Sequence, residues 1–149
     1  MHLQMQDVSA LKKEEAYTFL DTGSPHHVEL RDDVKSINVR EEGAAIRYSN
    51  LYGQEGANVN FVTQKEANTF AVRTYERGVE DETLSCGTGV TAVALAMYEK
   101  GLASAQDVHL LVEGGSLRVT FEKGENGYDE IYLIGPATFV FKGNFVWNA

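Results

Sequence analysis

The chain has 149 residues, 43% of them hydrophobic and 10% aromatic, which is typical of a single globular domain with a substantial core. Its 13 Lys and Arg against 22 Asp and Glu give a net charge of −9, which argues against nucleic acid or an anionic membrane as a partner. With one cysteine it can form no intrachain disulfide, and the N-terminus lacks the apolar stretch of a signal peptide. The longest apolar run, Val90 to Tyr98, is too short to cross a bilayer. We therefore expect one cytoplasmic domain over residues 1–149.

The N-terminal residues predict short strands separated by polar segments. Loose alternation over residues 3–8 indicates a first strand, and the charged segment 10–16 is predicted to be a solvated connection. Strands are predicted over 17–21 and 27–30. Between them, Thr-Gly-Ser-Pro at 22–25 is a turn signal, because proline fixes its own φ and holds the preceding residue extended.

A helix is predicted over residues 38–48. Asn38 is suited to the N-cap position, and Glu41 follows three residues later, as in a capping box. A glycine-rich loop then leads to two further predicted strands, 58–62 and 69–75.

The second half predicts a buried helix followed by strands. The segment from Val90 is apolar on nearly every side and ends at Gly101, so we expect a helix enclosed by sheet. Strands joined by strong turn signals are predicted after it, over residues 109–112, 116–122, 130–133 and 137–141. The fold class is α+β: a mostly antiparallel sheet curled into a barrel around a central helix, with a second helix nearer the surface.

Cys86 lies in a polar, glycine-containing loop at the start of that buried helix. Free cysteine has a pKa near 8.5, and a helix N-terminus is expected to lower it because its unpaired N–H groups favour an anion. Gly87, Thr88 and Gly89 leave those N–H groups accessible to the thiol or to a substrate carboxylate. The loop suits a nucleophile or a proton-transfer group, and the alternative is a buried, inert cysteine.

Three other site classes are disfavoured. The spacing Gly87-x-Gly89-x-x-Ala92 fits a dinucleotide fingerprint, but its lead-in, residues 80–85, is acidic instead of an apolar strand. A cysteine hydrolase needs a histidine base, for which His26 and the neighbouring histidine are candidates. One Cys and scattered His give no metal-ligand spacing, so no metal is expected.

Glu76 and Arg77 form a charge pair at the end of a predicted strand, just before the thiol loop. Such a pair is usually solvated or mutually paired. Beside a thiol and glycines it is also suited to the two ends of a zwitterion, with Glu binding an ammonium and Arg a carboxylate in a two-pronged contact.

These residues closely resemble the second-cysteine motif of the diaminopimelate epimerase family. The motif here is Glu-Arg-Gly at 76–78 followed by Glu-Thr-Leu-Ser-Cys-Gly-Thr-Gly at 82–89. Three further stretches agree: Asp-Thr-Gly-Ser-Pro-His at 21–26, Gly-Ala-Asn-Val-Asn-Phe-Val at 56–62 and Gly-Pro-Ala at 135–137. The resemblance spans nearly the whole chain and implies a cofactor-independent amino-acid epimerase that converts LL-diaminopimelate to the meso form, in lysine and cell-wall synthesis.

The resemblance also implies roles for individual residues. Two cysteines would flank the α-carbon, one removing a proton as thiolate while the other delivers one, and Cys86 would be one of them. Glu76 would meet the α-ammonium, and His26 matches a histidine that lies near the family's site. The remaining implied substrate-binding residues are Gly87 and Thr88 for the α-carboxylate, Arg77 and Asn58 for the distal end, and Ser24, where the family often has asparagine.

The chain departs from the family in having only one cysteine. The family enzyme has two similar domains facing a cleft, so this sequence resembles the C-terminal half, and an N-terminal domain is the implied partner. The last strand, about residues 139–149, would normally pair with that domain; without it, we expect this strand to be mobile, repacked or joined to another copy in a homodimer. We expect no epimerisation by this chain alone. A different cysteine-dependent enzyme, or an inert binding module on the same fold, is the alternative.

Overall fold

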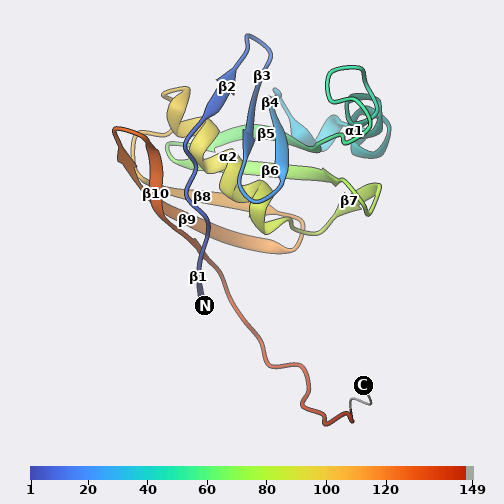
Figure 1. Cartoon of the computed structure of the whole chain (residues 1–149), viewed down its shortest axis with the longest axis vertical. Coiled ribbons are helices and arrows are strands. Elements are labelled where there is room, and N and C mark those ends of the chain that lie inside the picture. Colours follow the sequence, from blue (N-terminus) through green and yellow to red (C-terminus); the bar gives the residue numbers. More distant parts are fainter. Residues whose placement is uncertain (147–149) are drawn as a thin grey trace.

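The computed structural model describes residues 1–146 and shows a strongly curled mixed sheet around one buried helix (Figure 1). The helices are α1 (Val39–Arg47) and α2 (Gly87–Glu99), with a short 3₁₀ turn at Val34–Ser36. The strands are β1 (His2–Gln4), β2 (Leu11–Lys13), β3 (Tyr17–Asp21), β4 (Pro25–Leu30), β5 (Asn58–Glu66), β6 (Thr69–Glu76), β7 (Asp81–Thr83), β8 (Asp107–Val112), β9 (Gly115–Gly124) and β10 (Gly127–Ile134).

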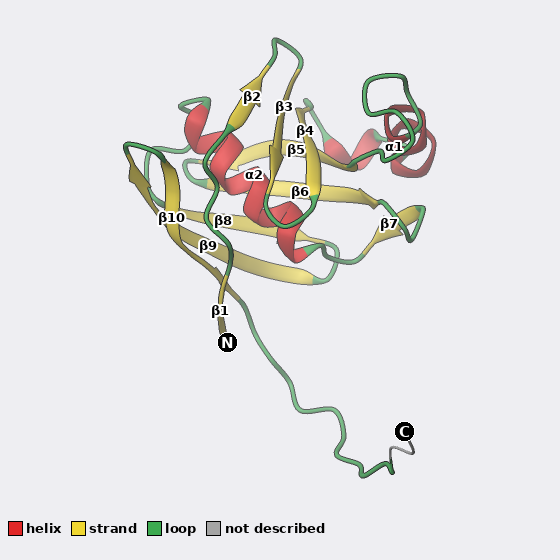
Figure 2. Cartoon of the chain, in the orientation of Figure 1, coloured by secondary structure: helices red, strands yellow, loops and turns green. Residues whose placement is uncertain are grey.

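The strands form one sheet in the order β1-β10-β9-β8-β6-β5-β4-β3-β2, with β7 attached to β6. All neighbours are antiparallel except β4 with β5 and β6 with β8, which are parallel. The sheet curls into a half-barrel that holds α2 in its concave side, as Figure 2 shows. The predicted α+β fold with a curled, mostly antiparallel sheet and a central helix is therefore confirmed.

The two edges of the sheet come from consecutive parts of the chain. Residues 1–13 run from β1 to β2 across α2, and so cover part of the open side of the half-barrel (Figure 1). Val8 in this segment is buried, forms a bridge with Tyr128 and belongs to the core cluster around α2. This segment therefore adds apolar packing on the side where no strand pairing within residues 1–146 closes the barrel.

Helix α2 is buried as predicted, because strands lie on most of its sides. Every residue from Gly89 to Met97 is buried, and the helix contacts β3, β4, β5, β6, β8, β9 and β10. Its alternating alanines, at 92, 94 and 96, keep its surface close to the sheet. It ends at Gly101, whose φ of +73° is the left-handed conformation expected of a C′ glycine.

Helix α1 packs on the outer side of β5 and β6 and begins as predicted. The Asn38 side chain accepts a hydrogen bond from the Glu41 N–H (3.3 Å), and its amide donates to the Glu41 carboxylate (3.1 Å). Gly43, which weakens the helix on propensity alone, faces the sheet, and a Cβ atom there would lie 2.4 Å from Cβ of Tyr75. The glycine lets helix and sheet approach closely.

Two sequence predictions differ from the structure. The charged segment 10–16 contains β2, an edge strand whose exposed lysines need only one hydrogen-bonded neighbour, β3. Residues 137–141 form no strand, because none of the described residues pairs with them.

After Ile134 the chain leaves the sheet and extends away from the domain, as Figure 1 shows. Five large apolar side chains in this tail are at least 79% exposed: Phe139, Val140, Phe141, Phe145 and Val146. The end of the predicted last strand, residues 147–149, lies outside the described residues. Neither α1 nor α2 is long and apolar enough to cross a membrane.

Candidate active site

Cys86 occupies the N-cap position of α2 in an extended conformation (φ −123°, ψ 111°). Its side chain is almost fully buried, and Sγ lies 3.5 Å from Oγ1 of Thr88. The Cys86 side chain makes no capping hydrogen bond to the backbone N–H groups of the first turn, although these groups lie close enough to lower the thiol pKa. A thiol at this position therefore faces the unpaired donors of a helix N-terminus, as the sequence predicts.

Gly89 is required by the close approach of β5 to the first turn of α2. A Cβ atom at this position would lie 2.6 Å from Oδ1 of Asn60 and 3.2 Å from Sγ of Cys86. The glycine thus keeps the thiol, the helix start and a buried strand in contact.

The expected low pKa of Cys86 is wrong for this chain. Burial raises the pKa of the thiol above its ordinary value, and the nearby Glu76 carboxylate raises it further. The donors at the helix start act in the predicted direction, because hydrogen bonds from Thr88 and Gly89 lower this pKa, but they do not outweigh burial. In the structure as it stands, Cys86 is a protonated thiol at neutral pH.

The turn at residues 22–25 lies over the start of α2. Oγ1 of Thr22 donates a hydrogen bond to the carbonyl oxygen of Thr88 (2.9 Å), and Gly23 adopts a φ of +102° that favours glycine. The following residues, Ser24 and Pro25, lead into β4. The Thr22 hydroxyl therefore ties this turn, which contains Ser24, to the helix whose N-cap is Cys86.

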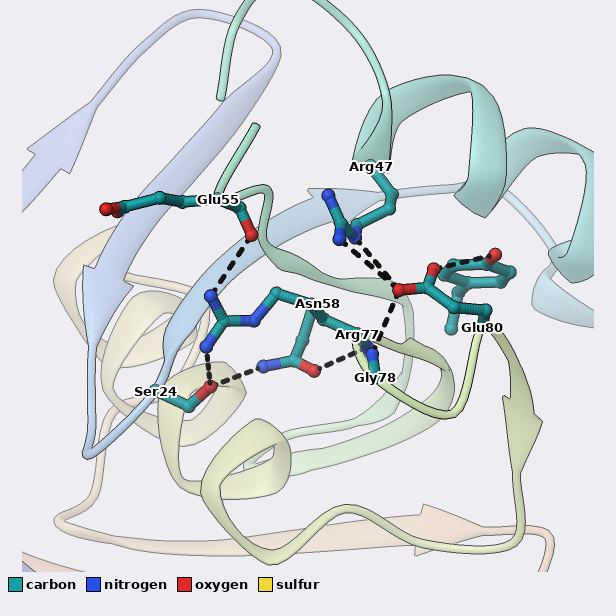
Figure 3. Close-up of polar contacts among 8 residues, drawn as sticks. Ser24, Arg47, Glu55, Asn58, Arg77, Gly78 and Glu80 are labelled. Carbon is teal, nitrogen blue, oxygen red and sulfur yellow. Dashed lines mark hydrogen bonds and ion pairs between the residues drawn. The ribbon is translucent and has the colours of Figure 1, made fainter. Parts of the chain in front are cut away.

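Ser24, Asn58 and Arg77 form a single hydrogen-bonded set (Figure 3). The Asn58 side chain donates to Oγ of Ser24 (2.8 Å) and accepts from the backbone N–H of Arg77 (2.9 Å). The Arg77 guanidinium reaches Oγ of Ser24 (3.5 Å) and donates to the carbonyl oxygen of Glu55 (3.1 Å). Within residues 1–146 no salt bridge holds this guanidinium, so both its nitrogens at the tip rest on neutral oxygens.

Glu76 lies at the end of β6, next to Arg77, but the two do not pair with each other. One carboxylate oxygen of Glu76 accepts a hydrogen bond from Oγ1 of Thr83 on β7 (2.9 Å). Its negative charge also raises the pKa of Cys86, although burial is the larger cause. The structure therefore places a carboxylate and a guanidinium separately beside the thiol loop.

His26 is fully buried beneath these residues and bonded to Asn60. The Asn60 amide donates to the carbonyl oxygen of His27 (2.9 Å) and lies 3.2 Å from Nδ1 of His26. Nδ1 therefore accepts, and the ring proton is on Nε2, which is buried without a hydrogen-bond partner among the described residues. Burial, with a smaller contribution from the Arg77 charge, lowers the pKa of His26 to about 3. The ring is neutral at physiological pH.

Neither histidine of the pair serves Cys86 as a hydrogen-bonded base. His26 bonds to Asn60, whereas His27 bonds to Tyr52 (2.7 Å) and to Glu29 (3.2 Å) on the other side of β4. Among residues 1–146 the thiol has no imidazole partner, so the Cys–His contact that a cysteine hydrolase requires is not present there.

Sequence reasoning missed two polar residues that support this region. Asn60 joins His26 to Thr74, whose hydroxyl donates to the Asn60 side-chain oxygen (2.9 Å). The alternation of Asn58 and Asn60 in an otherwise apolar strand was the available signal, because a buried amide requires partners. Gly87 is also confined by its surroundings, since a Cβ atom there would lie 3.1 Å from a methyl carbon of Leu133.

Solved structures of other proteins share the fold of this chain. The phenazine biosynthesis protein of the PhzF family from Bacillus anthracis matches with a TM-score of 0.52 at 19% identity, over 89% of this chain and 39% of that one. A probable proline racemase from Agrobacterium radiobacter K84 matches with a TM-score of 0.52 at 14% identity, over 89% and 40%. At this identity the likeness shows the fold alone.

Sequence comparison then gives the family. Residues 18–140 match the diaminopimelate epimerase family. A diaminopimelate epimerase of Flavobacterium psychrophilum is 51% identical over 94% of this chain and 55% of its own length, and that of Aquifex aeolicus is 44% identical over 84% and 44%. The chain belongs to the diaminopimelate epimerase family, as its motifs predict, and it spans about half the length of the curated relatives it matches.

Proposed function

We propose that this chain is one half of an epimerase that inverts the α-carbon of diaminopimelate, with Cys86 as one of two proton-transfer groups. The supporting observation is the placement of Cys86 at the N-cap of a buried helix, with Sγ 3.5 Å from Oγ1 of Thr88 in the first turn. A thiol held there can give or take a proton at a carbon bound above the helix start.

The substrate's charged groups match the groups around this thiol. The start of α2, at Gly87 and Thr88, provides N–H donors for the α-carboxylate. Glu76 provides a negative charge for the α-ammonium, and its position at the end of β6, bonded to Thr83 just before the thiol loop, supports this role. Arg77, held by Ser24 and Asn58, presents a guanidinium to the distal carboxylate.

His26 supports the site from below in this proposal. With its proton on Nε2 and a pKa of about 3, it is neutral and cannot act as a cationic acid at pH 7. Its buried Nε2–H has no hydrogen-bond partner within residues 1–146, and in this proposal the filled site supplies an acceptor for it.

Inversion requires proton transfer on both faces of the α-carbon, and the chain has a single cysteine. We therefore propose that the second thiol comes from a separate domain that closes over the start of α2, and that this chain alone does not epimerise. The exposed apolar tail, residues 137–146, supports an interaction with such a domain or with a second copy, because five large apolar side chains have no packing partner within residues 1–146. This chemistry needs no cofactor in the proposal, since one thiolate accepts the α-proton and the other thiol donates a proton to the opposite face.

The proposal is tested by solvent deuterium incorporation at the α-carbon of diaminopimelate. With the wild-type chain alone, diaminopimelate should incorporate no deuterium above background. After addition of the N-terminal domain of the Flavobacterium psychrophilum relative, diaminopimelate should incorporate deuterium. Cys86→Ala should abolish the restored exchange. Turnover by the chain alone that is lost in Cys86→Ala would contradict the two-domain requirement, and exchange that survives Cys86→Ala would contradict the role of the thiol.

A further inference from the structure

The turn that carries Arg77 is fastened to helix α1 by an ion pair outside the residues assigned to the site. Arg47, the last residue of α1, donates through Nη2 and Nε to one carboxylate oxygen of Glu80 (3.3 and 3.4 Å; Figure 3). The same oxygen accepts the backbone N–H of Gly78 (3.0 Å). The Arg47 side chain is only 11% exposed and that of Glu80 is 32% exposed, so this pair is shielded from solvent more than most surface pairs.

Arg47 also supports the second loop that contacts Arg77. A Cβ atom at Gly56 would lie 1.8 Å from a guanidinium nitrogen of Arg47, so the backbone at Gly56 rests directly on this side chain. Gly56 is adjacent to Glu55, whose carbonyl oxygen accepts from the Arg77 guanidinium, and lies two residues before Asn58, which accepts the Arg77 N–H. One arginine therefore lies between the two backbone segments, 55–58 and 77–80, that determine where Arg77 points.

Glu80 adopts a backbone conformation that glycine would adopt without strain. Its φ is +59°, in the left-handed region that side chains with a Cβ rarely occupy. Its carboxylate compensates with bonds to the Gly78 N–H, the Arg47 guanidinium and the Tyr75 hydroxyl (3.2 Å). A strained residue whose side chain makes several contacts beside a substrate-binding turn indicates a constraint on that turn.

We propose that Arg47 and Glu80 are positioning residues that hold Arg77 in the orientation that binds the distal carboxylate of the substrate. This inference rests on the proposed function for the identity of the ligand. The contacts that Arg47 and Glu80 make between α1 and the turn, here called the clamp, follow from the geometry alone. Loss of the clamp should loosen the turn at Gly78 and weaken the contact to the distal carboxylate, while Cys86 and the helix start remain in place.

The test uses Glu80→Gly and Glu80→Gln, with Glu82→Gln as the matched control. Glycine adopts the left-handed conformation at position 80 without strain, so Glu80→Gly removes the side-chain contacts and leaves the backbone conformation favoured. Glu82 forms an equally shielded pair with Arg73 on the same hairpin (2.7 Å) without touching the Arg77 turn. Amide hydrogen exchange of Gly78 should accelerate about tenfold or more in both Glu80 variants relative to wild type, and remain unchanged in Glu82→Gln.

A second measurement separates positioning from a general loss of structure. Binding of meso-diaminopimelate and of lysine, which lacks the distal carboxylate, is followed by amide shifts of residues 86–89, with the N-terminal domain of the relative added. Both Glu80 variants should lose affinity for diaminopimelate about fivefold or more while lysine binding is unchanged, because only the former ligand uses Arg77. Equal losses for the two ligands, or Gly78 exchange like that of wild type, would overturn the inference. Wild-type chain that binds neither ligand would instead contradict the proposed function, while the exchange measurement would still decide whether the clamp exists.

Discussion

Gly89 and Asn60 touch at the point where β5 meets the first turn of α2: a Cβ atom on Gly89 would lie 2.6 Å from the Asn60 side-chain oxygen. That oxygen already accepts the Thr74 hydroxyl, and the Asn60 amide holds His26. The contact joins the buried polar network to the helix turn that bears the thiol. Any side chain at 89 must therefore displace a satisfied, buried amide.

Gly89→Ala should destabilise the chain by about 1–3 kcal/mol, because the added methyl group overpacks a site with no room to relax. Urea unfolding followed by circular dichroism measures the change. Gly124→Ala is the control, since a Cβ atom there meets only ordinary contacts, 3.5 Å or more away, and its effect should stay within about 0.5 kcal/mol. Equal stability of Gly89→Ala and wild type would show that the helix start is not tightly confined.

The burial of His26 should make stability depend on pH. Its folded pKa of about 3 is below the ordinary 6.5, so the unfolded chain binds a proton that the folded chain excludes. This contribution is complete above pH 6.5 and is lost progressively as pH falls toward 3, with a slope of at most about 1.4 kcal/mol per pH unit. Most carboxylates stay ionised between pH 6.5 and 5, so this window isolates the histidines.

Unfolding free energies measured across that window should fall with acidification in wild type and fall less in His26→Gln. His109→Gln is the matched control, because His109 is an exposed residue on β8 and its removal should leave the slope as it is. A slope that is the same in wild type and His26→Gln would mean that the buried ring is protonated as easily as a free one.

Local patterns predicted the helices and the turn chemistry, and long-range pairing decided the rest. The capping box at Asn38 and the terminal glycine at 101 act within a few residues, so the sequence shows them directly. Strand β2 was missed because its lysines suit a solvated edge strand, and only the complete sheet shows that this segment lies at an edge. The strand expected at 137–141 has a β pattern but no ladder partner among the described residues, and a strand needs one.

The site shows the same division. Asn58 and Arg77 were predicted to bind the same end of the substrate and Ser24 to be a separate substrate contact, and the structure places all three in one hydrogen-bonded set. The partnership of Arg47 with Glu80 spans 33 residues and carries no local signal. The pKa of Cys86 was predicted in the wrong direction because burial is a property of the whole fold, whereas the helix terminus is a property of the local sequence.

Cys86 should react slowly with iodoacetamide in the native chain. Its raised pKa leaves little thiolate at neutral pH, and the side chain is almost fully buried. We expect alkylation at pH 8 about tenfold or more slower than in urea-unfolded chain, with the rate still rising above pH 9. Addition of diaminopimelate and the N-terminal domain should protect the thiol further. Alkylation as fast as in the unfolded chain would contradict the burial, and no protection would favour an inert cysteine.

A partly exposed network of hydrogen bonds and ion pairs ties the end of α2 to the sheet. The Glu99 carboxylate binds Lys13 (2.9 Å), Lys123 and the Tyr128 hydroxyl, and hydrogen bonds from Lys123, Tyr128 and Lys13 lower its pKa to about 2. Because the folded pKa is below the ordinary 4.5, this carboxylate stabilises the fold above pH 4.5, and its contribution is lost as pH falls toward 2.

Glu99→Gln should therefore cost about 1–3 kcal/mol at pH 7 and much less at pH 3, as measured by urea unfolding at both values. The matched control is Glu14→Gln, which breaks the exposed pair with Lys12 (3.1 Å) and should change stability by less than about 0.5 kcal/mol. A cost that is the same at both pH values would show that the ionised form of Glu99 contributes nothing.

The apolar tail should govern association without contributing to the stability of the domain. Phe139, Phe141 and Phe145 are each about 80% exposed, so their removal takes no packing from the core. Truncation after Thr138 should leave the free energy of unfolding within about 0.5 kcal/mol of wild type. In sedimentation velocity the full chain should form species larger than its 16.5 kDa monomer, and the truncated chain should sediment as a monomer. A full chain that is monomeric at all concentrations, with no binding to the N-terminal domain of the relative, would contradict the proposed role of the tail.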